Sequence, residues 1–241
     1  MTNTEICREN LEFVLDGHGV LAGFSTRLGG VSGGAYASLN LGDHVGDDPQ
    51  NVAQNREILA AALGIAPRNL KFMRQIHSNK VEILRAASDK ISPCDGLVTD
   101  LRGAALCMLV ADCSPVLVAD ERRGVVAAVH AGRAGVIGRI CTNAINLMSE
   151  RFGCVAAELK VFVGTNIKAR NYELGELDLG EFERYKTQGH FDMNAALRDE
   201  LAAAGVREVK FDPRCTFESE RHFSYRRDGI TGRFCGFVMN L

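Results

Sequence analysis

The chain has 241 residues, of which 46% are hydrophobic, and its 28 basic and 30 acidic residues give a formal net charge of −2. This length and apolar content are enough to bury a sizeable core in one large domain or two small ones. The near balance of charges gives no electrostatic reason to expect a nucleic-acid or membrane partner.

The start of the chain shows no basic segment followed by an apolar run, so no secretory signal is predicted. The most apolar stretch, residues 104–119, contains Asp112 and Pro115 and is too short and too polar to span a bilayer. The eight cysteines include no Cys-x-x-Cys pair, which favours reduced core cysteines over a disulfide framework. These features predict a cytoplasmic protein and leave its oligomeric state open.

The first predicted elements are a strand over residues 20–26 and a helix over residues 51–64. Asp48 can cap that helix, Pro49 can open it and Gly64 can end it. The later predicted elements are, in chain order, strands over 70–76, 80–85, 104–110, 116–118 and 124–130, a helix over 136–151, a strand over 160–163, a helix over 192–204, and strands over 206–211 and 232–239.

The chain contains no linker, charge block or internal repeat, so a single domain over residues 1–241 is predicted. Strands and helices are both plentiful, and several connections are too short for a helical crossover. This combination favours an α+β domain with mixed sheets over a strictly doubly wound arrangement.

Two histidines and a cysteine stand where predicted strands end. His77 follows a strand, Cys113 lies at a strand break, and His130 ends a buried strand before a Gly-rich turn. One thiolate and two imidazoles suit a zinc ion, and three protein ligands leave a fourth position for water or substrate, as in catalytic sites. From spacing alone, hydrogen-bonded core histidines and a packed cysteine are the simpler interpretation.

Charged residues near these three give weaker indications. Asp112 stands in an apolar stretch, so we expect it either to orient a ligand histidine or to pair with Arg133, without preference between the two. Arg56 can bind a phosphate or carboxylate from its helix, although a surface arginine is the simpler interpretation. The basic turn over residues 223–233 can bind an anion or can be a solvated turn.

A set of short segments in a fixed order carries a more specific signal. The segments are Phe24-Ser-Thr-Arg-Leu-Gly-Gly-Val-Ser, Ser38-Leu-Asn-Leu-Gly, Val45-Gly-Asp-Asp with Asn55-Arg56, Gln75-Ile-His77, Cys94-Asp-Gly-Leu-Val-Thr-Asp100, Ala111-Asp-Cys-Ser-Pro115, Val129-His-Ala-Gly132, Tyr172-Glu173, Cys215, Phe223-Ser-Tyr-Arg-Arg-Asp and Thr231-Gly-Arg. From about Phe24 to Phe237 the chain therefore resembles the laccase-domain or polyphenol oxidase-like family, which is also described as purine nucleoside phosphorylases and peptidoglycan editing factors.

The resemblance implies a zinc-dependent purine nucleoside phosphorylase that acts on adenosine, inosine and methylthioadenosine and also deaminates adenosine. It places the zinc ligands at His77, Cys113 and His130, and it implies an α/β/β/α layered fold like that of a cysteine-hydrolase-type toxin domain. Copper binding is expected to be incidental. Catalytic roles are expected for Arg56, Cys113 and His130, and substrate contacts for Asn40, Arg56, Gln75 and Arg226.

Two segments depart from the usual family pattern. Gly164-Thr-Asn-Ile167 replaces Gly-Pro-x-Ile, and Met193 replaces the second leucine of Leu-Asp-Leu. The first change is expected near the substrate wall, so it bears on substrate choice more than on the metal site.

Three other functions are considered for the same residues. Multicopper oxidation needs many more histidine ligands than the six histidines of this chain, which include no His-x-His pair. An editing hydrolase that removes a misincorporated L-Ser from a peptidoglycan precursor would use Cys113 and His130 as nucleophile and base, or zinc-activated water. A non-enzymatic, zinc-stabilised binding module would need the metal in order to fold.

Overall fold

Two mixed β-sheets form the centre of the protein in the computed structural model, which describes residues 8–17 and 19–241. The five-stranded sheet has the order β1 (Leu11–Gly17), β2 (Val20–Ser25), β13 (Phe234–Asn240), β6 (Ala105–Val110) and β3 (Leu70–Phe72). The six-stranded sheet has the order β12 (Glu208–Phe211), β9 (Lys160–Val163), β7 (Ser114–Asp120), β8 (Val125–Ala131), β5 (Gly96–Thr99) and β4 (Val81–Ile83). The pairs β3–β6, β4–β5 and β9–β12 are parallel and the other pairs are antiparallel, which confirms the predicted α+β class with mixed sheets.

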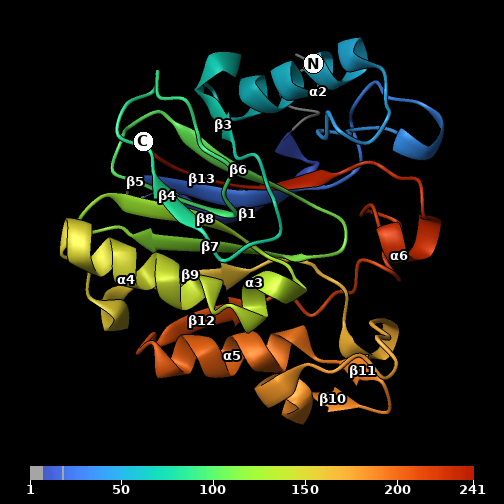
Figure 1. Cartoon of the computed structure of the whole chain (residues 1–241). Coiled ribbons are helices and arrows are strands. Elements are labelled where there is room, and N and C mark those ends of the chain that lie inside the picture. The colour runs from blue at the N-terminus through green and yellow to red at the C-terminus, as the bar shows by residue number, and fades with distance from the viewer. Residues whose placement is uncertain (1–7, 18) are drawn as a thin grey trace.

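Helices cover the outer faces of the two sheets, so the layers follow the order α/β/β/α (Figure 1). Helix α2 (Pro49–Ala62) lies on the five-stranded sheet, and α3 (Arg133–Ile137), α4 (Ile140–Phe152) and α5 (Met193–Ala203) lie on the six-stranded sheet. Shorter elements are α6 (Tyr225–Asp228), the hairpin β10 (Lys186–Thr187) and β11 (His190–Phe191), and five 3₁₀ turns, η1 (Gly34–Tyr36), η2 (Pro67–Asn69), η3 (Ala156–Glu158), η4 (Ala169–Asn171) and η5 (Gly180–Tyr185). No helix in the described part of the chain has the length and apolar character that crossing a membrane requires.

The central strands are apolar along their whole length because both of their faces are covered. Successive side chains of a strand point to opposite faces, so β6 contributes to two cores at once. Leu106, Met108 and Val110 pack between the sheets, and Ala105, Cys107 and Leu109 pack toward α2. A third core lies between the six-stranded sheet and α3, α4 and α5.

Local signals set the ends of the predicted helices. The Asp48 side chain accepts a hydrogen bond from the backbone N–H of Gln50 at 2.8 Å, and Gly64 has a left-handed φ of 71° just beyond α2. The Asp192 carboxylate likewise accepts from the N–H of Ala195 at 2.9 Å and caps α5.

Some predicted elements differ from those in the structure. The helix predicted over residues 136–151 is two helices, because Arg139 between them is left-handed with φ 56°. Strands β1 and β5 were not predicted, and the strands near residues 70 and 80 are only three residues long. The seven cysteines in the described residues are unpaired thiols, as expected; Cys7 lies outside those residues.

Candidate metal centre and active site

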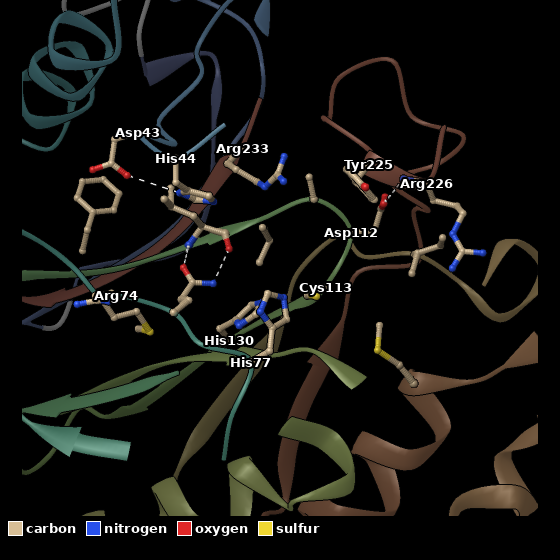
Figure 2. Close-up of a pocket in the computed structure, with 18 of the residues that line it drawn as sticks. Asp43, His44, Arg74, His77, Asp112, Cys113, His130, Tyr225, Arg226 and Arg233 are labelled. Carbon is tan, nitrogen blue, oxygen red and sulfur yellow. Dashed lines mark hydrogen bonds and ion pairs between the residues drawn. The ribbon is translucent and has the colours of Figure 1, made fainter. Parts of the chain in front are cut away.

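His77, Cys113 and His130 converge at one pocket, although they come from distant parts of the chain. His77 follows β3, Cys113 lies in the connection from β6 to β7, and His130 belongs to β8. Their ligand atoms all lie within 4.8 Å of one another, and they line a cavity of about 950 Å³. Figure 2 shows the three side chains together, with Arg233 across the cavity from them. The β6–β7 connection passes from one sheet to the other, so the site lies at a crossing of the chain between the two sheets.

The Asp95 carboxylate fixes the orientation of His130. The ring Nδ1 of His130 donates to Asp95 Oδ1 at 2.8 Å, and its backbone N–H donates to the Asp95 carbonyl at 2.7 Å. Both side chains are buried. Because Nδ1 is committed to the carboxylate, Nε2 is the nitrogen left to bind a metal ion.

The same carboxylate also holds the turn that carries His77. The backbone N–H groups of Ile76, His77 and Ser78 donate to Asp95 at 3.2, 3.0 and 2.7 Å, and the Ser78 hydroxyl donates at 2.8 Å. His77 has a φ of 56°, a left-handed conformation that few non-glycine residues adopt. These four hydrogen bonds to Asp95 therefore stabilise the unfavourable backbone conformation of His77, a predicted ligand.

Three features of the cluster fit a zinc ion. The donors are one thiol and two imidazoles, a set that zinc prefers. Burial alone would raise the pKa of the Cys113 thiol, but the positive charge and hydrogen bonds of His130 and His77 lower it below its usual value, which favours the thiolate that a metal binds. Gly132 leaves space beside them: a Cβ there would lie 3.1 Å from Cys113 Sγ and 3.4 Å from His77 Cδ2.

Four arginines give the pocket walls a cationic character, with two aspartates as the acidic lining residues. The arginines are Arg56, Arg74, Arg226 and Arg233, and the acids are Asp43 and Asp112. This excess of positive charge suits an anionic ligand.

Arg56 lines the pocket, but much of its hydrogen-bonding capacity is used inside the protein. Its Nε and Nη2 donate to the Leu41 carbonyl at 3.0 and 2.8 Å, and it pairs with Asp43 at 3.2 Å. Its guanidinium also stacks on Phe72, with 4.2 Å to the ring centroid.

Asp112 has neither of the two contacts considered from the sequence. Its Oδ1 accepts from the Thr216 hydroxyl at 2.5 Å, and its Oδ2 accepts from the backbone N–H of Arg226 at 2.7 Å. It therefore ties α6 to the segment that carries Cys113. The carboxylate that orients a histidine is Asp95, which the sequence analysis missed even though it lies in a matching family segment.

Two predicted substrate residues have side-chain amides engaged with the backbone. Gln75 donates to the Leu109 carbonyl at 2.8 Å and accepts from the Leu109 N–H at 2.7 Å, so it fastens the His77 segment to β6. Asn40 is fully buried outside the residues that line the pocket, and its Oδ1 accepts from the N–H groups of Gly42 and Arg233 at 3.0 and 2.8 Å. Arg226 does line the pocket; its Nη1 donates to the Glu173 carbonyl at 2.8 Å.

The departures from the family pattern lie in two different places. Thr165 and Asn166 are buried outside the residues that line the pocket, where Thr165 donates to Asp212 at 2.9 Å and Asn166 donates to Asn194 at 2.7 Å. Met193 and Ile167 line the pocket. Met193 is therefore the departure that reaches the cavity.

Comparison with known proteins identifies relatives along almost the whole chain. A family model described as "Multi-copper polyphenol oxidoreductase laccase" matches residues 21–240. A purine nucleoside phosphorylase of Corynebacterium glutamicum is 44% identical over 227 residues, which cover 89% of this chain and 92% of that protein. The purine nucleoside phosphorylase Rv2149c of Mycobacterium tuberculosis is 39% identical, with 89% of each chain covered.

Solved structures of similar proteins have the same fold. YlmD from Geobacillus stearothermophilus superposes with a TM-score of 0.86 at 31% identity and 92% coverage of both chains. The Neisseria meningitidis protein NMB0706 superposes with a TM-score of 0.84 at 34% identity, covering 96% of this chain and 99% of that one.

Proposed function

This chain belongs to the family described as multi-copper polyphenol oxidoreductase laccase, and we propose that it is a zinc-dependent purine nucleoside phosphorylase. The observation that carries the proposal is the convergence of His77, Cys113 and His130 at the base of a cationic pocket. The names of the relatives from Corynebacterium glutamicum and Mycobacterium tuberculosis support the same activity. The proposed substrates are adenosine, inosine and methylthioadenosine, and the whole of residues 1–241 is proposed to form one such domain.

Phosphorolysis needs a site that tolerates separated charge. A phosphate oxygen forms a bond to C1′ of the sugar while the C1′–N9 bond breaks and its electron pair goes to the purine; the proton of hydrogen phosphate ends on the base. Positive charge builds on the sugar and negative charge on the base. We propose that Arg56 and Arg226 add positive charge at the walls that stabilises the negative charge building on the reacting groups, and that Gln75 and Asn40 act by fixing the segments around them.

The Cys113 and His130 side chains, together with His77, are proposed to hold the zinc ion. When bound there, zinc would supply positive charge that stabilises negative charge on a neighbouring oxygen. Asp95 keeps His130 in the tautomer that leaves Nε2 available, and the turn over residues 76–78 keeps His77 in place. We also propose adenosine deamination in this pocket, a reaction in which water replaces the C6 amino group and ammonia leaves.

Zinc is proposed in preference to copper oxidation chemistry. The full sequence has six histidines and no His-x-His pair, whereas a multicopper oxidase needs a blue-copper centre and a trinuclear cluster. Copper can still bind incidentally, because it outranks zinc in affinity for such ligands.

A turnover assay tests the proposal against the hydrolase alternative. Purified protein is incubated with phosphate and each nucleoside, and separately with a cell-wall precursor that carries L-Ser, and products are identified by mass spectrometry. Free purine together with ribose 1-phosphate supports phosphorolysis, and conversion of adenosine to inosine supports deamination. Product from the precursor alone would instead support the editing hydrolase, with either Cys113 and His130 as nucleophile and base or a zinc-activated water.

A further inference from the structure

Arg233 differs from the other arginines of the pocket in its surroundings. Arg74 and Arg226 are exposed, and Arg56 pairs with Asp43. Arg233 is half-buried, and it forms no salt bridge with any carboxylate in residues 8–17 or 19–241. Its Nη1 donates to the carbonyls of Thr231 and Gly232, both at 2.9 Å, which leaves the Nε and Nη2 donors without a protein acceptor in the same residues.

This environment is unfavourable for a cation in the absence of a ligand. Burial lowers the pKa of the Arg233 guanidinium, and the negative charges of Asp112 and Cys113 only partly oppose that effect. The guanidinium carbon lies 5.9 Å from the centroid of the Tyr225 ring, which compensates the charge only in part. A desolvated charge without a carboxylate partner costs free energy, so an anion that binds beside it supplies that partner.

The backbone and stem of Arg233 are held firmly. Its N–H donates to Asn40 Oδ1 at 2.8 Å, and its carbonyl accepts from the Leu41 N–H at 3.0 Å. The stem lies against Gly42, where a Cβ would be 2.9 Å from Arg233 Cγ. Figure 2 shows the guanidinium extending into the cavity between His44 and Tyr225, on the side away from His77, Cys113 and His130.

We infer that Arg233 is the residue that binds the inorganic phosphate co-substrate. The inference rests on the proposed phosphorolysis and assigns the phosphate to one arginine of the basic turn over residues 223–233, for which the sequence left anion binding and a solvated turn both open. A guanidinium with two unused donors can bind two oxygens of one phosphate. Arg56 is less suited because its Nε and Nη2 are already bonded to Leu41. Phosphate at Arg233 would lie across the cavity from the metal cluster, in a pocket of about 950 Å³.

Steady-state kinetics of Arg233→Met and Arg233→Lys test the assignment. Methionine keeps an apolar stem against Gly42 but removes the charge, so the KM for phosphate is expected to rise by about 10- to 100-fold, the loss expected for a charge-assisted pair of hydrogen bonds. The KM for inosine is expected to stay within about threefold, and Arg233→Lys should recover part of the phosphate affinity. Arg151→Gln removes the same charge from the exposed face of α4, outside the residues that line the pocket, and should change the phosphate KM by less than about threefold.

Direct binding separates this inference from the proposed function. Binding of inorganic phosphate is measured by calorimetry with wild-type protein and both Arg233 variants, each checked for folding by circular dichroism. Arg233-dependent phosphate binding without nucleoside turnover would support this site and reject the phosphorylase. Phosphorolysis with an unchanged phosphate KM in a folded Arg233 variant would reject the assignment alone. If Arg233→Met does not fold, the comparison of Arg233→Lys with wild type decides.

Discussion

Asp95 Oδ1 lies 2.8 Å from His130 Nδ1, and the same carboxylate accepts the backbone N–H of His77 at 3.0 Å. One buried carboxylate thus orients two of the three proposed ligands, the first through its ring and the second through its backbone. The positions of both histidines depend on this shared anchor.

Replacing Asp95 with asparagine should weaken zinc binding by about 10- to 100-fold. His130 loses its charged partner, and the backbone N–H groups of residues 76–78 lose one of the two carboxylate oxygens that accept from them. Competition with a chromophoric chelator measures the affinity. Asp120→Asn is the matched control, since Asp120 is also buried but bonds to Arg123 at 3.0 Å instead of to a ligand. Equal zinc affinity in Asp95→Asn and wild type would show that the carboxylate does not support the site.

Replacing Cys113 with alanine should abolish turnover while the chain stays folded. The protein has three apolar cores besides the metal cluster, so the loss of unfolding free energy should be at most about 2 kcal/mol, or several degrees in Tm. Calorimetry of this variant, and of wild type treated with a chelator, checks the result. Global unfolding in both samples would favour the zinc-stabilised binding module.

Replacing Gly132 with alanine should lower zinc affinity by about tenfold, roughly 1.4 kcal/mol. The new Cβ would lie 3.1 Å from Cys113 Sγ and 3.5 Å from His130 Cε1, so a ligand must shift. The backbone of Gly132, with φ −77° and ψ 172°, is one that alanine adopts readily. Gly33→Ala serves as the control, because a Cβ there has open space. Unchanged zinc affinity in Gly132→Ala would mean that the cluster has more room than the distances indicate.

His222 should make the protein sensitive to mild acid. Burial lowers its pKa to about 4, from 6.5, with only partial opposition from Glu12. Between those values the unfolded chain binds the proton and the folded chain does not, so stability is lost as pH falls from 6.5 toward 4, by up to about 3 kcal/mol. Denaturant unfolding of wild type and His222→Gln across this range measures the difference. Parallel pH profiles for the two proteins would contradict the prediction.

The sequence predicted most of the fold where local signals were strong. Asp48 and Gly64 mark the ends of α2, and the continuous apolar runs of β6 and β8 identify strands covered on both faces. The break at Arg139 was not predicted because a left-handed residue other than glycine has no reliable sequence signal.

The site was predicted less completely, because partners far apart in sequence are fixed by the folded chain. Resemblance selected the three proposed ligands, but the sequence does not show which carboxylate meets which histidine. Asp112 was considered for that role without preference over a pair with Arg133, and Asp95 was not considered. Asn40 and Gln75 were predicted to touch substrate. Gln75 does line the pocket while its amide bonds to the Leu109 backbone, and Asn40 lies outside the lining residues with its amide bonded to the backbone. Those hydrogen bonds join segments far apart in sequence, which only the folded chain brings together, so the sequence does not reveal them.

The position of Cys113 between β6 and β7 has a mechanical consequence. His77 extends from the first sheet and His130 from the second, so one ion held by all three would join the layers at their open edge. Any substitution that slides one layer over the other changes the spacing of the donors. The apolar core between the sheets, to which Leu117 belongs, therefore contributes to the geometry of the site even though none of its buried side chains binds the ion.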